Sequence, residues 1–94
     1  MTTVKNAQRQ IRRCEGFDVR FCYSDGKDVR DDKQSIPAYG YERAASENET
    51  VKWWRENRFG KRYAGYECEV LDGNGKVCHG GMLLRTVRES YGKS

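Results

Sequence analysis

Two stretches of this chain share one pattern: residues 16–21 read GFDVRF and residues 65–70 read GYECEV. Alternation of apolar and polar residues with a period of two is typical of a strand buried on one face. A glycine turn followed by lysine comes after each stretch, at residues 24–27 and 73–76. A tight turn between such runs predicts a β-hairpin, with returning strands at residues 28–30 and 77–79. Common hairpin chemistry alone explains the likeness, so it does not require a duplication.

A helix is expected before the first hairpin. Val4, Ala7, Ile11 and Cys14 fall at intervals of three and four residues, which places them on one apolar stripe of a helix. Gly16 is a natural stop just past its end. The stripe therefore predicts that this helix packs on the sheet with its other side in water.

Two further helices are expected. The second helix begins at Ser46, which forms a capping-box pattern with Glu49, or at Thr50, and it ends at Gly60. A second capping-box pattern over residues 86–89 predicts a short last helix that reaches Tyr91.

These elements predict one small α+β domain over residues 1–94. The two helix–hairpin units are expected to form a four-stranded antiparallel sheet, with the helices packed on one face and water on the other. The residues expected to face the helices are Phe17, Val19, Phe21, Tyr66, Cys68 and Val70, and those expected to face water are Asp18, Arg20, Glu67 and Glu69.

Several aromatic residues have two interpretations. Tyr39 and Tyr41 stand in the long connection 31–45, where ordered aromatic residues often serve function, but either ring also fits the edge of a thin core. Trp53 and Trp54 are adjacent on the second helix, so they point about 100° apart. We expect Trp54 to be buried with Val51. Trp53 either is available for stacking or covers the edge of the sheet.

The net charge is +4, and the basic residues gather in two stretches. The first helix carries four cations off its apolar stripe and no acid before Glu15; residues 51–63 hold five basic residues against Glu56 alone. Local positive charge attracts phosphate or an acidic protein surface. The alternative is that both stretches are solvated helix faces.

The sequence offers little for catalysis. His79 is the only histidine and stands beside two glycines, without a nucleophile motif around it. The cysteine pairs Cys14–Cys22 and Cys68–Cys78 lack the short spacing of zinc knuckles. We therefore expect no enzyme, no cofactor and no metal ion. The chain opens without a secretory signal or an apolar run of membrane-spanning length, so we expect a cytosolic protein with reduced thiols.

Scaffold motifs occur in order along the chain at residues 16–21, 41–45, 50–59, 65–70 and 84–88. In these segments the chain resembles small phage and prophage accessory proteins of the anti-CRISPR kind. This resemblance implies a stoichiometric inhibitor that docks on a host RNA-guided surveillance complex and blocks binding of target DNA. Many such inhibitors are acidic DNA mimics, whereas this chain is basic. Its charge favours a groove that exposes guide RNA or an acidic protein surface.

We therefore predict a monomer that acts in the host cell cytoplasm on proteins of a CRISPR effector complex, with its guide RNA as a further partner, and on neither a membrane nor a small-molecule substrate. The alternatives are a phage accessory protein that binds nucleic acid directly, and a phage structural or adaptor protein. The predicted partner-binding residues are Lys5, Arg9, Arg12, Arg13, Lys27, Arg30, Trp53, Arg55 and Arg58.

Overall fold

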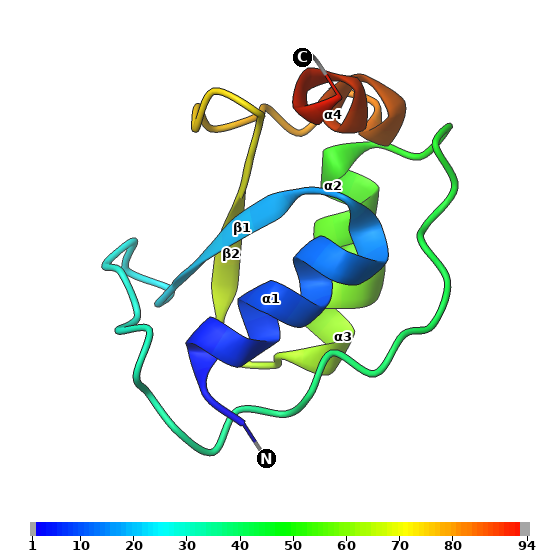
Figure 1. Ribbon diagram of the computed structural model, residues 1–94. Coiled ribbons are helices and arrows are strands. Elements are labelled where there is room, and N and C mark those ends of the chain that lie inside the picture. Colours follow the sequence, from blue (N-terminus) through cyan, green and yellow to red (C-terminus); the bar gives the residue numbers. More distant parts are fainter. Residues whose placement is uncertain (1, 93–94) are drawn as a thin grey trace.

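The computed structural model describes residues 2–92 as a small α+β domain (Figure 1). The elements in chain order are α1 (Val4–Glu15), β1 (Asp18–Cys22), α2 (Val51–Trp54), the π-helical η1 (Arg55–Phe59), α3 (Gly60–Arg62), β2 (Glu67–Leu71) and α4 (Leu84–Tyr91). Because α2, η1 and α3 follow one another without a break, they form one continuous helix. Within the described residues, no helix has both the length and the apolar character needed to cross a membrane.

The predicted four-stranded sheet is wrong. Within residues 2–92 the sheet has only β1 and β2, which pair antiparallel with Val19 opposite Val70. Both glycine turns form and reverse the chain after each strand. Each returning arm, however, contributes a single bridge, at Asp28 to the end of β1 and at Val77 to the end of β2.

Just beyond each returning arm, the backbone caps one of the two main helices. The Lys5 amide donates to the Asp31 carbonyl over 2.9 Å, and the Lys52 amide donates to the Gly80 carbonyl over 3.0 Å. The first amides of a helix have no partner within that helix. These carbonyls therefore accept hydrogen bonds from the first amides of the helices and do not extend the sheet.

The two halves of the chain repeat one structural unit. Thr3 caps α1 with φ −93° and ψ 163°, and Thr50 caps α2 with φ −93° and ψ 164°. Each threonine is followed by valine and lysine, then by a helix, a strand, a glycine turn and a returning arm. The likeness therefore extends beyond the hairpins to a helix–hairpin unit at residues 3–28 and 50–77.

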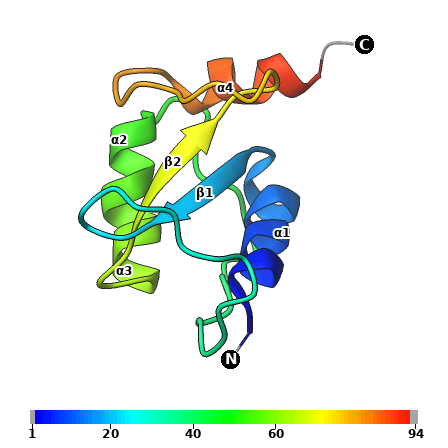
Figure 2. The ribbon, with the colours of Figure 1, turned by 90° about the vertical axis from the view of Figure 1, so that its left-hand side faces the viewer.

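Both main helices cover the same face of the strands, as predicted. Val19, Phe21, Cys68 and Val70 are buried beneath them, whereas Arg20 is exposed on the opposite face. Figure 2 looks onto that open face, with α1 and the α2–α3 helix behind it on either side. The alternating pattern of the sequence thus predicted the inward and outward sides of the strand pair.

The second helix begins after Thr50, so the later of the two predicted starts is right, but its predicted end at Gly60 is wrong. The helix continues to Arg62. The Gly60 amide donates to the Arg55 carbonyl, which is a π turn, and a Cβ at position 60 would lie 3.0 Å from that oxygen. Glycine here accommodates a widened turn instead of ending the helix.

The last helix starts earlier than the capping-box pattern predicted. It begins at Leu84, and Thr86 lies inside its first turn. The Leu84 amide donates to the Glu49 carbonyl over 2.8 Å, and the Arg85 amide donates to the Glu47 carbonyl over 3.1 Å. Backbone carbonyls from the segment before α2 thus cap α4, and they fix α4 against the start of that helix.

Candidate anion-binding surface

Four basic side chains lie on the solvent side of α1. Val4, Ala7 and Ile11 are fully buried, so packing of this stripe on the sheet turns the remaining sides of the helix outward. Gly16 adopts a left-handed conformation with φ 87°, which glycine tolerates without steric cost, and it leads the chain directly into β1. The exposed basic residues are Lys5, Arg9, Arg12 and Arg13.

A shallow groove of about 480 Å³ runs between α1 and the start of β1. The side-chain amide of Gln8 donates to the Val19 carbonyl over 3.0 Å, which holds the helix beside the strand. The structure thus brings together four of the predicted partner-binding residues in one groove. Its lining residues are Lys5, Gln8, Arg9, Arg12, Arg13, Asp18, Val19 and Leu71. We call it the α1 groove.

Only one of these four cations has a charged partner within the described residues. Arg12 Nη1 lies 3.2 Å from Asp18 Oδ2, and the Arg12 guanidinium lies 4.4 Å from the centre of the Tyr91 ring. Both members of the ion pair are about half exposed, so the pair contributes little to stability. The other three cations form no ion pair within residues 2–92, and the groove therefore carries an excess of positive charge.

The repeated unit shows that the fold does not need these cations. A related groove of about 390 Å³ lies between the α2–α3 helix and β2. Counted from the two capping threonines, the four basic positions of α1 correspond to Lys52, Glu56, Phe59 and Gly60. The second unit folds with a cation at only one of these four positions, and its other basic residues stand elsewhere on the helix, at Arg55, Arg58, Lys61 and Arg62. The architecture of the unit therefore does not require all four of these cations of α1, which we call the basic row.

The two predicted residues of the first hairpin lie outside the α1 groove. Lys27 is exposed, and its amide donates to Asp25 Oδ1 over 3.0 Å in the glycine turn. Arg30 is exposed on the returning arm and pairs with Asp32 at 3.2 Å. Neither side chain lines the groove.

The predicted residues of the second helix have three different environments. Trp54 is fully buried and Trp53 is partly buried against the core, which confirms the predicted difference between them. Arg55 lines the groove of the second unit. Arg58 points into the molecule, where its Nη1 lies 2.6 Å from Glu15 Oε2. Arg58 therefore forms an internal ion pair and is not free to bind a partner, which the sequence did not reveal.

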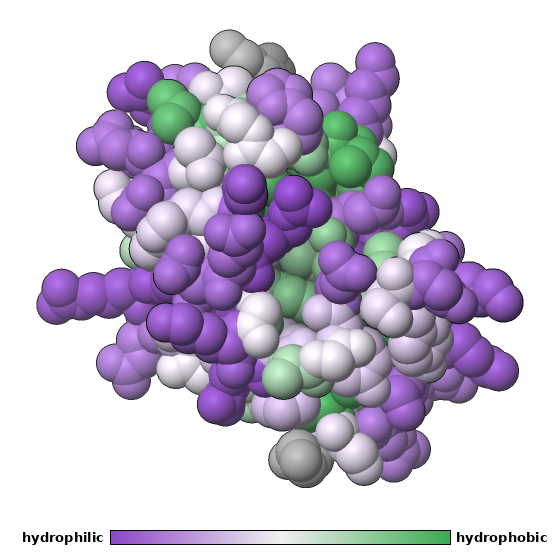
Figure 3. All heavy atoms as spheres, turned by 180° about the vertical axis from the view of Figure 1, so that it is seen from behind, coloured by the Kyte–Doolittle hydropathy of each residue, from purple (hydrophilic) through white to green (hydrophobic). Residues whose placement is uncertain are grey.

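Hydrophilic side chains dominate the side of the molecule that carries α2. Figure 3 shows this side, on which the hydrophobic side chains of the coloured residues form only small, separated patches. A partner on this side would find little continuous apolar area. Charge is thus the stronger guide to binding on this side of the molecule.

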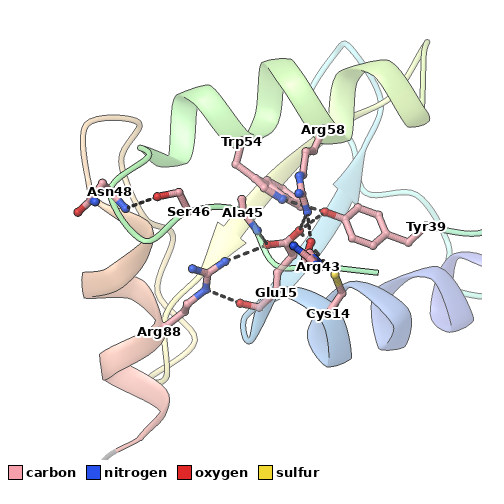
Figure 4. A network of polar contacts seen from close by, with 10 residues as sticks. All are labelled: Cys14, Glu15, Tyr39, Arg43, Ala45, Ser46, Asn48, Trp54, Arg58 and Arg88. Atoms are coloured by element: carbon pink, nitrogen blue, oxygen red, sulfur yellow. Dashed lines mark hydrogen bonds and ion pairs between the residues drawn. The ribbon is translucent and has the colours of Figure 1, made fainter. Parts of the chain in front are cut away.

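Glu15 is the centre of a buried polar network that sequence reasoning missed (Figure 4). Its carboxylate is fully buried and pairs with Arg58 at 2.6 Å and with Arg88 at 2.9 Å. It also accepts hydrogen bonds from the Tyr39 hydroxyl over 2.5 Å and from the Ala45 amide over 2.9 Å. One side chain thus joins α1, the long connection, η1 and α4.

The network also fixes Tyr39 and Trp54. The Trp54 indole donates to the Tyr39 oxygen over 3.0 Å. Burial, the hydrogen bond to Glu15 and its negative charge raise the pKa of Tyr39, so this phenol stays protonated and donates to the carboxylate. Of the two interpretations of Tyr39, the structure thus supports a core residue. A signal existed for Glu15, because it continues the stripe of Ala7 and Ile11 at intervals of four residues.

The thiols and the histidine form no evident reactive group. Burial is the largest cause that raises the pKa values of Cys14, Cys68 and Cys78, which disfavours the nucleophilic thiolate. His79 is exposed. Among residues 2–92, no three His, Cys, Asp or Glu side chains are grouped so that they could hold a metal ion.

Comparisons of the chain with protein families, with curated proteins and with solved structures found no match.

Proposed function

We propose that this protein is a non-enzymatic inhibitor that docks through the α1 groove on a host RNA-guided surveillance complex, as its resemblance to anti-CRISPR proteins implies. The observation that carries the proposal is the excess of unpaired cations in the groove. On this proposal the protein acts as a monomer in the host cell cytoplasm, and binding prevents the complex from engaging target DNA.

An anionic partner would relieve the repulsion among the cations of the basic row. Like charges on neighbouring turns of a helix repel one another and destabilise it slightly, and the second unit of this chain folds with Lys52 as its only cation at the four equivalent positions. An anionic partner removes this repulsion. Arginine suits that role because its planar guanidinium binds phosphate and carboxylate groups through two parallel hydrogen bonds.

Reversal of two groove charges tests the proposal. Lys5 and Arg9 are exposed and line the α1 groove, so Lys5→Glu with Arg9→Glu should change stability by only about 0.5 kcal/mol per site. A control with the same charge change is Lys76→Glu with Arg85→Glu, at exposed positions outside the groove.

Pull-down of type I surveillance complexes and phage plating on CRISPR-active cells give the readout. The groove variant should lose binding and inhibition, since like charges across an interface cost several kcal/mol, whereas the control should behave as the wild type. Equal inhibition by the groove variant and the wild type would refute the role of the α1 groove.

The accessible, unpaired cations also favour a second candidate, direct binding of free nucleic acid. A protein that neutralises three phosphates of a single strand should show a slope of about −2 in log K against log salt concentration, from roughly 0.7 per contact. Tight binding of free nucleic acid with this slope, and no binding to the complex, would favour the second candidate. Weak binding of free nucleic acid with tight binding to the complex favours the inhibitor.

A further inference from the structure

Arg13 links the α1 groove to a second hollow. On one side it lines the groove. On its other side it lines a hollow of about 390 Å³, whose lining also includes Cys14, Tyr41 and Glu42. The long connection is fixed here, because the Tyr39 amide donates to the side-chain oxygen of Gln10 over 2.8 Å. The connection therefore runs beside the C-terminal half of α1, and the two hollows adjoin at one arginine.

A third hollow continues the same surface to Arg62. It measures about 240 Å³ and shares Tyr39, Gly40 and Tyr41 with the second hollow. Gly40 has φ +77°, and a Cβ there would lie 3.1 Å from Nη2 of Arg62. Arg62 Nε donates to the Ala38 carbonyl over 2.5 Å. Glycine thus lets the Arg62 guanidinium lie across the connection, where it forms no ion pair within residues 2–92.

Tyr41 stands between these cations. Its ring is half-buried, with the Arg58 guanidinium 4.5 Å from its centre and the Tyr39 ring centre 4.9 Å away. These neighbours hold the ring in place while it lines both smaller hollows. The acids along the surface are Asp18, which is paired with Arg12, and Glu42 at the rim, so positive charge remains in excess.

We propose that this surface binds a single strand of nucleic acid, with its phosphates along the basic side chains and an unstacked base against Tyr41. The residues of this strip, which we call the α1–Tyr41 strip, are Lys5, Arg9, Arg13, Tyr41 and Arg62. The proposal rests on the proposed function and deepens it, because it selects a nucleic-acid strand over an acidic protein surface as the anion.

The chemistry of the strip favours that choice. Surfaces that bind single strands combine a positively charged track for the backbone with aromatic rings on which bases stack. A carboxylate-rich protein surface pairs with the cations, whereas a single strand pairs with the cations and also places a base against the ring between them. A duplex keeps its bases stacked inside, so it cannot offer one to Tyr41. Guide RNA exposed in a complex and a free strand share this chemistry.

Binding of a labelled single-stranded RNA of about 12 nucleotides, within the range that single-strand-binding domains occupy, tests the strip at low salt. Arg13→Gln and Arg62→Gln should each reduce the salt slope by about 0.7. Tyr41→Leu should weaken binding by roughly 5- to 150-fold and leave the slope unchanged. Tyr41→Phe keeps the ring and should bind as the wild type does, which separates loss of stacking from loss of folding.

Ultraviolet cross-linking followed by mass spectrometry identifies the source of the strand. A cross-link from Tyr41 to guide RNA in the loaded complex supports the strip with guide RNA as the source, and a cross-link to the free oligonucleotide supports it with free nucleic acid as the source. Wild-type binding by Tyr41→Leu and Arg62→Gln, with no cross-link in either sample, would overturn the strip. If Lys5→Glu with Arg9→Glu still abolishes binding to the complex, the α1 groove stands and its partner is an acidic protein surface.

Discussion

Glu15→Gln should destabilise the protein more than any single change at its surface. The carboxylate is fully buried and holds Arg58, Arg88, Tyr39 and the Ala45 amide. Glutamine keeps one oxygen but replaces the other with an amide nitrogen, which cannot accept a hydrogen bond. The new amide nitrogen therefore points a hydrogen-bond donor at groups that are themselves donors. The substitution also leaves the guanidinium groups of Arg58 and Arg88 without their counter-charge.

The expected cost is about 3 kcal/mol. Loss of one partner of a buried ion pair costs roughly 3–5 kcal/mol. The lower end applies because the Arg58 and Arg88 side chains are 17% and 22% exposed, so water can reach them when the carboxylate is removed. With a urea m-value of about 2 kcal/mol/M, this loss lowers the unfolding midpoint by about 1.5 M.

Urea unfolding followed by circular dichroism measures the effect, with Glu89→Gln on the exposed side of α4 as the matched control. The control should stay within about 0.5 kcal/mol of the wild type. Glu15→Gln combined with Arg58→Met should cost less than the sum of the single changes, with a coupling of roughly 0.5–3 kcal/mol. A Glu15→Gln midpoint equal to that of the control would show that the network does not hold the four segments together.

Trp54→Ala should cost about 3–5 kcal/mol, because Trp54 is fully buried, while Trp53→Ala should cost much less; reversed urea midpoints would contradict the orientation of α2. Burial raises the pKa of Tyr63 from 10.0 to about 12, so its contribution to stability should be constant below pH 10 and should be lost as the pH rises toward 12; Tyr63→Phe should flatten this alkaline loss in melts across that range. Addition of EDTA should leave the circular dichroism spectrum unchanged, and cooperative unfolding on chelation would reveal a structural metal ion.

The regular parts of the fold were predictable from local pattern. The stripe from Val4 to Ile11 and the glycine at position 16 set α1 correctly, and the alternation in the two strand sequences gave their buried sides. Patterns of this kind succeed because a helix or strand that buries one side must repeat its apolar residues at the period of its backbone.

The errors arose where distant backbone groups compete for the same partners. The sequence does not reveal that the carbonyls of Asp31 and Gly80 cap helices, so residues 28–30 and 77–79 were assigned to the sheet. The π turn at Gly60 was not predicted, because a glycine that ends a helix and a glycine beside a widened turn cannot be told apart in a sequence. From the sequence, Glu15 was considered only as the first acid after the cations of α1. Its position on the stripe of Ala7 and Ile11 indicated that it is buried.

The structure distinguishes arginines that form buried ion pairs from arginines that are exposed and unpaired, which the sequence does not. Arg58 and Arg88 neutralise a buried carboxylate, so they contribute to stability and are unavailable to a partner. Arg9 and Arg13 have no ion-pair partner within residues 2–92, and the equivalent positions of the second unit are Glu56 and Gly60. The second unit keeps only Lys52 of the four equivalent cations, so it serves as a partial internal control. Folding explains the first pair of arginines, and we propose an anionic partner for the second.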